Sequence, residues 1–168
     1  MYLGQLLKSV SKKYQKINVQ GISFDSRKVK KKDIFFAIQG NQTSGIKFIN
    51  EAIFKGATAI VCAKKIRYPN CPIPIIIVKN IRRSLSEACS GLYRKKPKNI
   101  IAVTGTNGKS SVAYFFYQIL SLNNISTASI GTLGIISKKY NKKINLTSMD
   151  PLSLHNNLQI LARNNVNH

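Results

Sequence analysis

Residues 100–111 read IIAVTGTNGKSS, an apolar β-branched run followed by a glycine-rich turn and then by Lys-Ser at the head of an apolar segment. This pattern predicts a strand over 99–103 and a helix over 111–122, the order found in α/β proteins. Gly105 and Gly108 let the backbone curl so that successive N–H groups face one anion at the helix N-terminus. The segment therefore predicts a phosphate-binding loop.

Two side chains of this loop carry the expected chemistry. Lys109 would reach the outer phosphates of a nucleotide, and the Ser110 hydroxyl could ligate Mg²⁺, so we expect ATP and Mg²⁺ as ligands. The common form GxxxxGK[ST] would place glycine where this chain has Val103, so TGTNGKS is a variant. A glycine turn that merely precedes a lysine is the alternative. The loop alone does not separate a kinase, an ATPase and an ATP-dependent ligase.

The rest of the chain alternates between strand-like and helix-like segments, which predicts an α/β fold. Pro97 closes a first unit, so we expect domains over 1–97 and 98–168. Gly56 and Asn80 stand where a helix C-terminus and an N-cap are expected. In the first domain we expect helices over 2–10, 46–53 and 81–92, and strands over 19–24, 34–38, 57–62 and 72–78. In the second, a strand over 126–130 and a helix beginning at Asp150-Pro151 follow the loop and its helix.

Composition excludes several classes of protein. Hydrophobic residues make up 43% of the 168-residue chain, which argues against intrinsic disorder. No apolar run approaches the roughly 20 residues that span a bilayer, and the first residues do not resemble a secretory signal, so we expect a cytoplasmic chain with no membrane partner. Three cysteines without CxxC spacing predict buried reduced thiols, with neither a disulfide framework nor a structural metal site.

The net charge of +22, from 27 Lys and Arg against 5 Asp and Glu, raises the question of a nucleic-acid partner. The basic clusters at 28–32, 94–98 and 138–143 are scattered along the chain. Aromatic residues do not interleave with them as a single-strand stacking platform requires. We therefore expect a solvated basic surface and no nucleic acid, and keep a basic nucleic-acid-binding protein as an alternative.

Five segments, taken together, resemble the Mur ligase family, and within it the branch of UDP-N-acetylmuramoyl-tripeptide synthetases (MurE type). They are TGTNGKSS (104–111), IGTLG (130–134), LTSMDPLSL (146–154), GISFDSRKVKKKDIFFAIQG (21–40) and FINEAIFKGATAIV (48–61). The resemblance covers nearly the whole chain, in the family's order. It implies a small α/β domain that binds a UDP-linked substrate over 1–97, and the incomplete beginning of a P-loop, Rossmann-like central domain over 98–168.

The resemblance also implies the site residues, with Lys109 as the catalytic one and Ser110 as the Mg²⁺ ligand. The implied ATP- and phosphate-binding residues are Gly105, Thr106, Asn107, Gly108, Lys109, Ser110 and Ser111. The implied UDP-substrate-binding residues are Ser26, Arg27, Asn41, Gln42, Thr43, Thr147 and Ser148. The chain departs from the family pattern where Ser44 replaces Asp, and where Leu146, Ser148 and Met149 replace Asn, Thr and Pro. Leu146 cannot make the hydrogen bonds of an amide.

Enzymes of this family activate a substrate carboxylate with ATP, and the amine of an incoming amino acid then displaces phosphate from the acyl phosphate. The resemblance implies UDP-MurNAc-L-Ala-D-Glu as the acceptor and meso-diaminopimelate or L-lysine as the added residue, for peptidoglycan precursor synthesis. It ends at His168, so we expect an N-terminal portion that binds its ligands without completing catalysis, the remainder of the ligase being a potential partner. A non-catalytic UDP-sugar- or nucleotide-binding remnant is the alternative.

Overall fold

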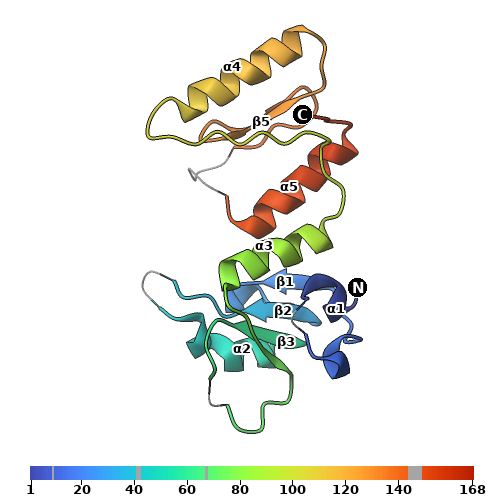
Figure 1. Ribbon diagram of the computed structural model, residues 1–168, viewed down its shortest axis with the longest axis vertical. Coiled ribbons are helices and arrows are strands. Elements are labelled where there is room, and N and C mark those ends of the chain that lie inside the picture. Colours follow the sequence, from blue (N-terminus) through green and yellow to red (C-terminus); the bar gives the residue numbers. More distant parts are fainter. Residues whose placement is uncertain (9, 41–42, 67, 144–148) are drawn as a thin grey trace. The chain divides into compact units, whose positions relative to one another are not determined.

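The computed structural model describes residues 1–8, 10–40, 43–66, 68–143 and 149–168. The chain divides into two compact units, Met1–Leu92 and Tyr93–His168 (Figure 1). Both units combine helices and strands, and the first contains a parallel sheet, so the predicted α/β class is confirmed.

Four parallel strands form the sheet of the first unit, in the order β1-β2-β3-β4. They are β1 (Gly21–Ser23), β2 (Asp33–Phe36), β3 (Ala59–Cys62) and β4 (Ile75–Ile77). Every residue of β2 and β3 is buried, as expected for parallel strands covered on both faces. The four strands predicted in this unit are therefore present, each shorter than the sequence pattern indicated.

Helices cover the sheet of the first unit. Side chains alternate between its two faces, so Phe35 and Ile60 share one face, where they pack with Ile49 and Ala52 of the next helix. On the other face, the last helix of the unit packs against the first helix and β1. The α-helices of this unit are α1 (Leu3–Leu6), α2 (Ile49–Phe54) and α3 (Ile81–Leu92). Its described 3-10 helices are η1 (Lys12–Tyr14), η2 (Ser26–Lys28) and η3 (Gly45–Phe48).

In the first unit, two of the predicted helix termini agree with the structure and one does not. Asn80 Oδ1 accepts the Arg83 N–H at 3.0 Å and caps α3, and Gly56 follows α2 with a φ of +91°. The helix predicted over 2–10 is wrong beyond Leu6, because Leu7 has an extended backbone (φ −131°, ψ 114°). Leu7 and Val10 are nevertheless buried. Their apolar side chains therefore indicate burial and not a continued helix.

The second unit contains α4 (Lys109–Leu122), the strands β5 (Ala128–Gly131) and β6 (Gly134–Ser137), and α5 (Pro151–Arg163). The strands form an antiparallel hairpin, whose second strand the sequence analysis did not predict. Ile135, Leu161 and Val166 form its small buried core. The predicted start of α5 is confirmed, since the Asp150 carboxylate accepts the Ser153 N–H at 2.9 Å and Pro151 is the first helical residue.

The strand predicted over 99–103 is wrong. Residues 99–103 belong to no strand and no described strand pairs with them, and the Asn99 N–H donates to the carbonyl of Asn167 at 2.9 Å. Ile100 and Ile101 are 58% and 62% exposed. A strand requires a neighbour to bond its backbone groups, and an apolar sequence does not supply one.

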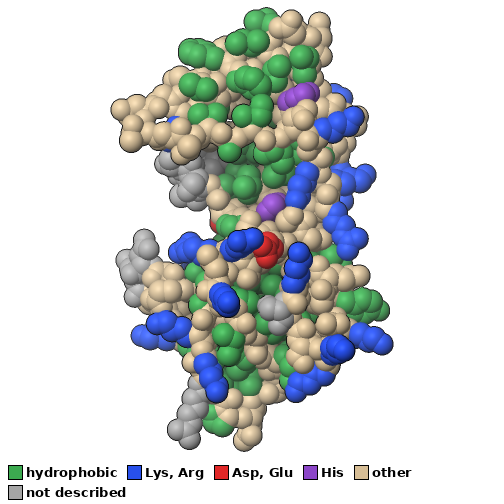
Figure 2. Space-filling model, in the orientation of Figure 1, with side chains coloured by type: hydrophobic (Ala, Val, Ile, Leu, Met, Phe, Trp, Pro, Cys, Tyr) green, Lys and Arg blue, Asp and Glu red, His purple; other side chains and the backbone are tan. Residues whose placement is uncertain are grey.

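The helix that follows this segment is similarly uncovered. Helix α4 has no buried residue, and apolar side chains gather over it (Figure 2). Tyr114, Phe115, Ile119 and Leu122 line an open cavity of about 680 Å³ on its surface. The second unit therefore exposes an apolar face of α4.

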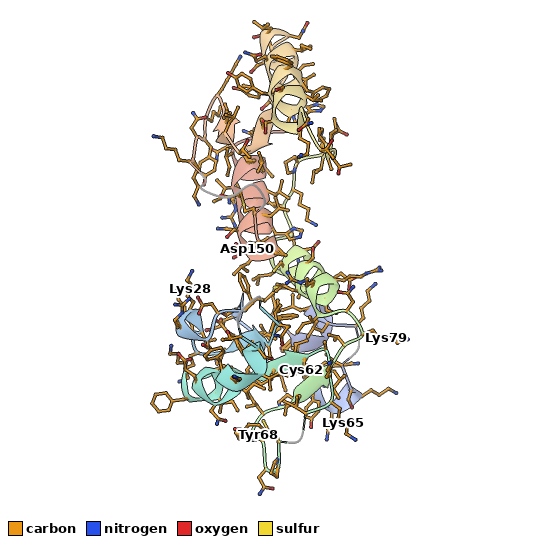
Figure 3. All side chains as sticks on the ribbon, turned by 90° about the vertical axis from the view of Figure 1, so that its left-hand side faces the viewer. Lys28, Cys62, Lys65, Tyr68, Lys79 and Asp150 are labelled. Carbon is orange, nitrogen blue, oxygen red and sulfur yellow. The ribbon has the colours of Figure 1, made fainter. Side chains whose placement is uncertain are left out.

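The three cysteines are free and differ in burial. Cys62, at the end of β3, lies inside the first unit, whereas Lys28, Lys65 and Lys79 project from its surface (Figure 3). Burial raises the pKa of the Cys62 thiol to about 11. Cys89 is buried and Cys71 is half-buried, so the prediction of buried thiols holds for two of the three.

We expect iodoacetamide to modify Cys71 of the native chain well before Cys62. The thiolate is the form of cysteine that reacts. With a pKa of about 11, only about one Cys62 side chain in a thousand would be a thiolate at pH 8, and Cys62 is also buried. Mass spectrometry of peptides after timed labelling measures the two rates. In denaturant both cysteines should react alike. Equal rates in the native chain would contradict the burial of Cys62.

Candidate functional site

The predicted phosphate loop forms the entry to α4. Gly108 is the N-cap of this 14-residue helix and has a φ of +75°, and Gly105 has a φ of +150°. These are backbone conformations that favour glycine. A Cβ at Gly108 would meet no atom within 4 Å, so the space beside the helix N-terminus is open. The loop thus presents the free N–H groups and the positive dipole end of a long helix to that space.

Lys109 folds back over the loop. Its Nζ donates to the carbonyl oxygens of Gly105 at 2.5 Å and of Thr106 at 3.0 Å. These bonds satisfy the ammonium group while keeping it at the mouth of the loop, where the outer phosphates of a nucleotide would lie. The structure therefore brings together the glycines, the lysine and the helix N-terminus that the sequence pattern selected.

Ser110 is fixed by a residue that the sequence analysis did not select. Its Oγ lies 2.7 Å from Oγ1 of Thr132, in the turn between β5 and β6. The described residues contain no group of three or more His, Cys, Asp or Glu side chains that could hold a metal by themselves. A single protein oxygen, the Ser110 hydroxyl, nevertheless fits Mg²⁺, because this ion is commonly held by one or two protein oxygens together with substrate phosphates and water.

A second group of predicted residues lies at one edge of the sheet in the first unit. Ser26 and Arg27 follow the carboxyl end of β1, and Thr43 follows that of the neighbouring strand β2. Ligands of open α/β sheets bind outside the carboxyl ends of the strands. Thr43 is exposed, and its carbonyl accepts the Gly40 N–H at 2.9 Å.

Ser26 and Arg27 differ in exposure. Ser26 is 6% exposed, and its hydroxyl donates to Oε2 of Glu51 at 2.6 Å. The Arg27 side chain is 82% exposed and forms a bidentate pair with Asp25, in which both N···O distances are 2.9 Å. This pair lowers the pKa of the Asp25 carboxyl. Ser26 is therefore buried and hydrogen-bonded to Glu51, whereas Arg27 is largely exposed and paired with Asp25.

Glu51 and Lys55 complete this cluster, and the sequence analysis selected neither. Lys55 Nζ donates to Glu51 Oε1 at 2.7 Å and to the Ser26 carbonyl at 3.2 Å. The hydrogen bonds from Lys55 and Ser26 hold the pKa of Glu51 below its ordinary value. The spacing of four residues between Glu51 and Lys55 on a helix is a signal that could have indicated the pair.

The depressed pKa of Glu51 predicts a loss of stability in acid. The folded chain favours the carboxylate, so this contribution is present above the unfolded pKa of about 4.5 and is lost as pH falls through the lower folded value. We expect Glu51→Gln to reduce the fall in melting temperature between pH 6 and pH 3, measured by circular dichroism. Glu87→Gln is the control, because the Glu87–Arg83 pair is more exposed. An unchanged acid dependence in Glu51→Gln would contradict this assignment.

Four of the predicted substrate residues cannot be placed. Asn41, Gln42, Thr147 and Ser148 lie outside the described residues. Within the part of the chain that is described, no helix is long and apolar enough to cross a membrane. Basic side chains are spread over the visible face in Figure 2.

Two family models match the chain in succession. The model of the "Mur ligase family, catalytic domain" matches residues 18–93, and that of the "Mur ligase middle domain" matches residues 103–168. The second match begins just before the phosphate loop. The fold, the loop and both matches show that the chain belongs to the Mur ligase family, as its sequence motifs indicated.

Individual relatives agree with this assignment. UDP-N-acetylmuramoyl-L-alanyl-D-glutamate–2,6-diaminopimelate ligases from Bradyrhizobium diazoefficiens and Rickettsia conorii are 41% and 43% identical over 90% and 91% of this chain. A solved structure of a ligase with the same name is 26% identical, with a TM-score of 0.81 over 99% of this chain. The MurF ligase from Thermotoga maritima, at 24% identity and a TM-score of 0.52 over 82% of this chain, shares the fold.

The chain is shorter than these relatives. It spans 31% and 32% of the two curated ligases, 34% of the solved diaminopimelate ligase and 29% of the MurF ligase. About a third of the length of a diaminopimelate ligase is therefore represented here.

Proposed function

We propose that this chain is the substrate- and nucleotide-binding portion of an ATP-dependent amide ligase of peptidoglycan precursor synthesis. The acceptor is UDP-MurNAc-L-Ala-D-Glu and the added residue is meso-diaminopimelate. The names of the relatives favour diaminopimelate over L-lysine. The observation that carries the proposal is the loop at residues 105–110, which holds Lys109 over an open helix N-terminus.

Within this proposal the two units have different ligands. The unit that contains the loop binds the ATP phosphates through the backbone N–H groups of Gly105 to Ser110 and through Lys109. Mg²⁺, when bound with ATP at Ser110, would offset phosphate charge. The first unit binds the UDP end of the acceptor at the carboxyl edge of β1 and β2, where Ser26, Arg27 and Thr43 lie. Asn41, Gln42, Thr147 and Ser148, which lie outside the described residues, are further proposed contacts.

The chemical demand on these residues is charge compensation. The substrate carboxylate attacks the γ-phosphoryl group of ATP, and both reactants are anions. The O–P bond of the acyl phosphate forms as the bond to ADP breaks, and the amine of the amino acid later displaces phosphate to form the amide. Lys109 supplies a fixed positive charge near the transferred group. A cytoplasmic site belongs to the proposal, since reduced cysteines suit a reducing compartment.

Calorimetric titration of the 168-residue chain tests the proposal directly. We expect binding of Mg-ATP and, independently, of UDP-MurNAc-L-Ala-D-Glu. Because the chain spans about a third of the relatives' length, we expect no amide product from this chain alone with either diaminopimelate or lysine.

Three results would overturn parts of the proposal. Turnover with either amino acid would show that the chain is a ligase by itself, and turnover with lysine alone would reverse the assigned specificity. Binding of the UDP substrate without ATP would identify a UDP-sugar-binding module. If the chain binds neither Mg-ATP nor the UDP substrate but binds DNA in a salt-sensitive way, the result would favour a nucleic-acid-binding protein.

A further inference from the structure

The contact between Ser110 and Thr132 joins the start of α4 to the β5–β6 turn. The two hydroxyl oxygens are 2.7 Å apart although the residues are 22 positions apart in the sequence. Helix α4 packs against β5, which brings the turn to the loop. Both residues belong to the second unit, and both lie near the surface.

If Ser110 ligates a cation, its hydroxyl must be the donor in the hydrogen bond with Thr132. A serine hydroxyl has one proton and two lone pairs, and ligation of a cation uses a lone pair. The proton must then point to an acceptor away from the cation. Thr132 Oγ1 is an acceptor at hydrogen-bond distance, and a bound cation would strengthen the bond by polarising the Ser110 O–H. Without a cation, either hydroxyl can be the donor.

We propose that Thr132 is a positioning residue for Mg²⁺ at this loop. By accepting the Ser110 proton, it keeps a lone pair of Ser110 directed toward the nucleotide phosphates. The inference rests on the proposed binding of Mg-ATP at residues 105–110, and it adds a residue outside the loop to that site. Hydrogen-bond partners of metal ligands commonly change metal affinity by about 10- to 100-fold when removed.

The test compares Thr132→Val, which has nearly the same shape without a hydroxyl, with Thr132→Ser, which keeps the hydroxyl. Each 168-residue chain is titrated with ATP in EDTA and, in a separate experiment without EDTA, with Mg²⁺ at saturating ATP. We expect Thr132→Val to weaken Mg²⁺ binding to the ATP complex about tenfold. Its affinity for metal-free ATP should equal that of the parent, and Thr132→Ser should restore the Mg²⁺ affinity.

A double-mutant cycle tests whether the effect passes through Ser110. In a Ser110→Ala background, Thr132→Val should have no further effect on Mg²⁺ affinity. Equal Mg²⁺ affinity of Thr132→Val and the parent would overturn this inference alone. Equal losses of Mg²⁺-dependent and metal-free ATP binding would also overturn it, because a general role in folding predicts that result. If the parent binds no ATP under either condition, the proposed function fails and this inference fails with it.

Discussion

The Lys109→Ala chain should bind Mg-ATP at least about a hundredfold more weakly than the parent, a loss of roughly 2.7 kcal/mol. In the structure the ammonium is held at the mouth of the loop by the carbonyls of Gly105 and Thr106. A nucleotide would exchange these neutral acceptors for phosphate oxygens, which form stronger charge-assisted bonds. Alanine removes that charge and leaves the loop backbone in place. Calorimetry with Mg-ATP measures the change.

Lys139→Ala is the matched control for this variant. It removes the same charge from an exposed position in the same unit, so it separates the local contact from the general effect of net charge. We expect Lys139→Ala to change the affinity less than twofold at physiological salt, where distant charges are screened. Binding of UDP-MurNAc-L-Ala-D-Glu should be unchanged in both variants. A similar affinity of Lys109→Ala and the parent for Mg-ATP would mean that the loop does not bind phosphate.

Gly134→Ala should destabilise the second unit by about 3 kcal/mol. Gly134 begins β6 with a φ of +98°, and a Cβ there would overlap the carbonyl oxygen of Lys142. That carbonyl accepts the Ile135 N–H at 2.8 Å, so it cannot move away without breaking the pairing of Ile135 and Lys142. Hydrogen exchange of the amides in β5, β6 and α5 should show the loss as faster exchange.

Gly131→Ala is the control in the same hairpin. A Cβ at Gly131 would meet no atom within 4 Å, and its φ is not positive. We therefore expect Gly131→Ala to change stability by less than about 1 kcal/mol. Amides of the first-unit strands β2 and β3 should exchange at parental rates in both variants. Comparable exchange in Gly134→Ala and the parent would contradict the tight packing of this turn.

Local patterns predicted the elements whose stability is decided close by in the sequence. The first-unit strands could be predicted because short apolar segments alternate there with turns and helices, as in a buried parallel sheet. The capping residues Asn80 and Asp150 were found because each cap is a bond to a backbone N–H three residues along. The strand predicted over 99–103 is absent because a strand needs a hydrogen-bonded neighbour, and the sequence of the segment does not specify one.

The same distinction applies to the candidate site. The phosphate loop is continuous in sequence, so its glycines and Lys109 could be selected by spacing alone. Thr132 is hydrogen-bonded to Ser110, 22 residues away in the sequence, and Glu51 to Ser26, 25 residues away. Local sequence patterns do not predict contacts between residues so far apart. The resemblance to the Mur ligases did include IGTLG, which contains Thr132, but it assigned no contact to this threonine. Packing of α4 on β5 was needed to bring the two hydroxyls together.

The uncovered face of α4 also affects how this protein behaves at high concentration. Phe115 is 60% and Leu122 82% exposed, so two copies that approach with these faces together would gain by removing both from water. The charge of +22 opposes that approach through long-range repulsion, which is strong at low ionic strength and weak once salt screens it. We therefore expect colloidal stability to depend on ionic strength: dilute buffer should keep copies apart, and concentrated salt or a polyanion should allow them to associate through α4.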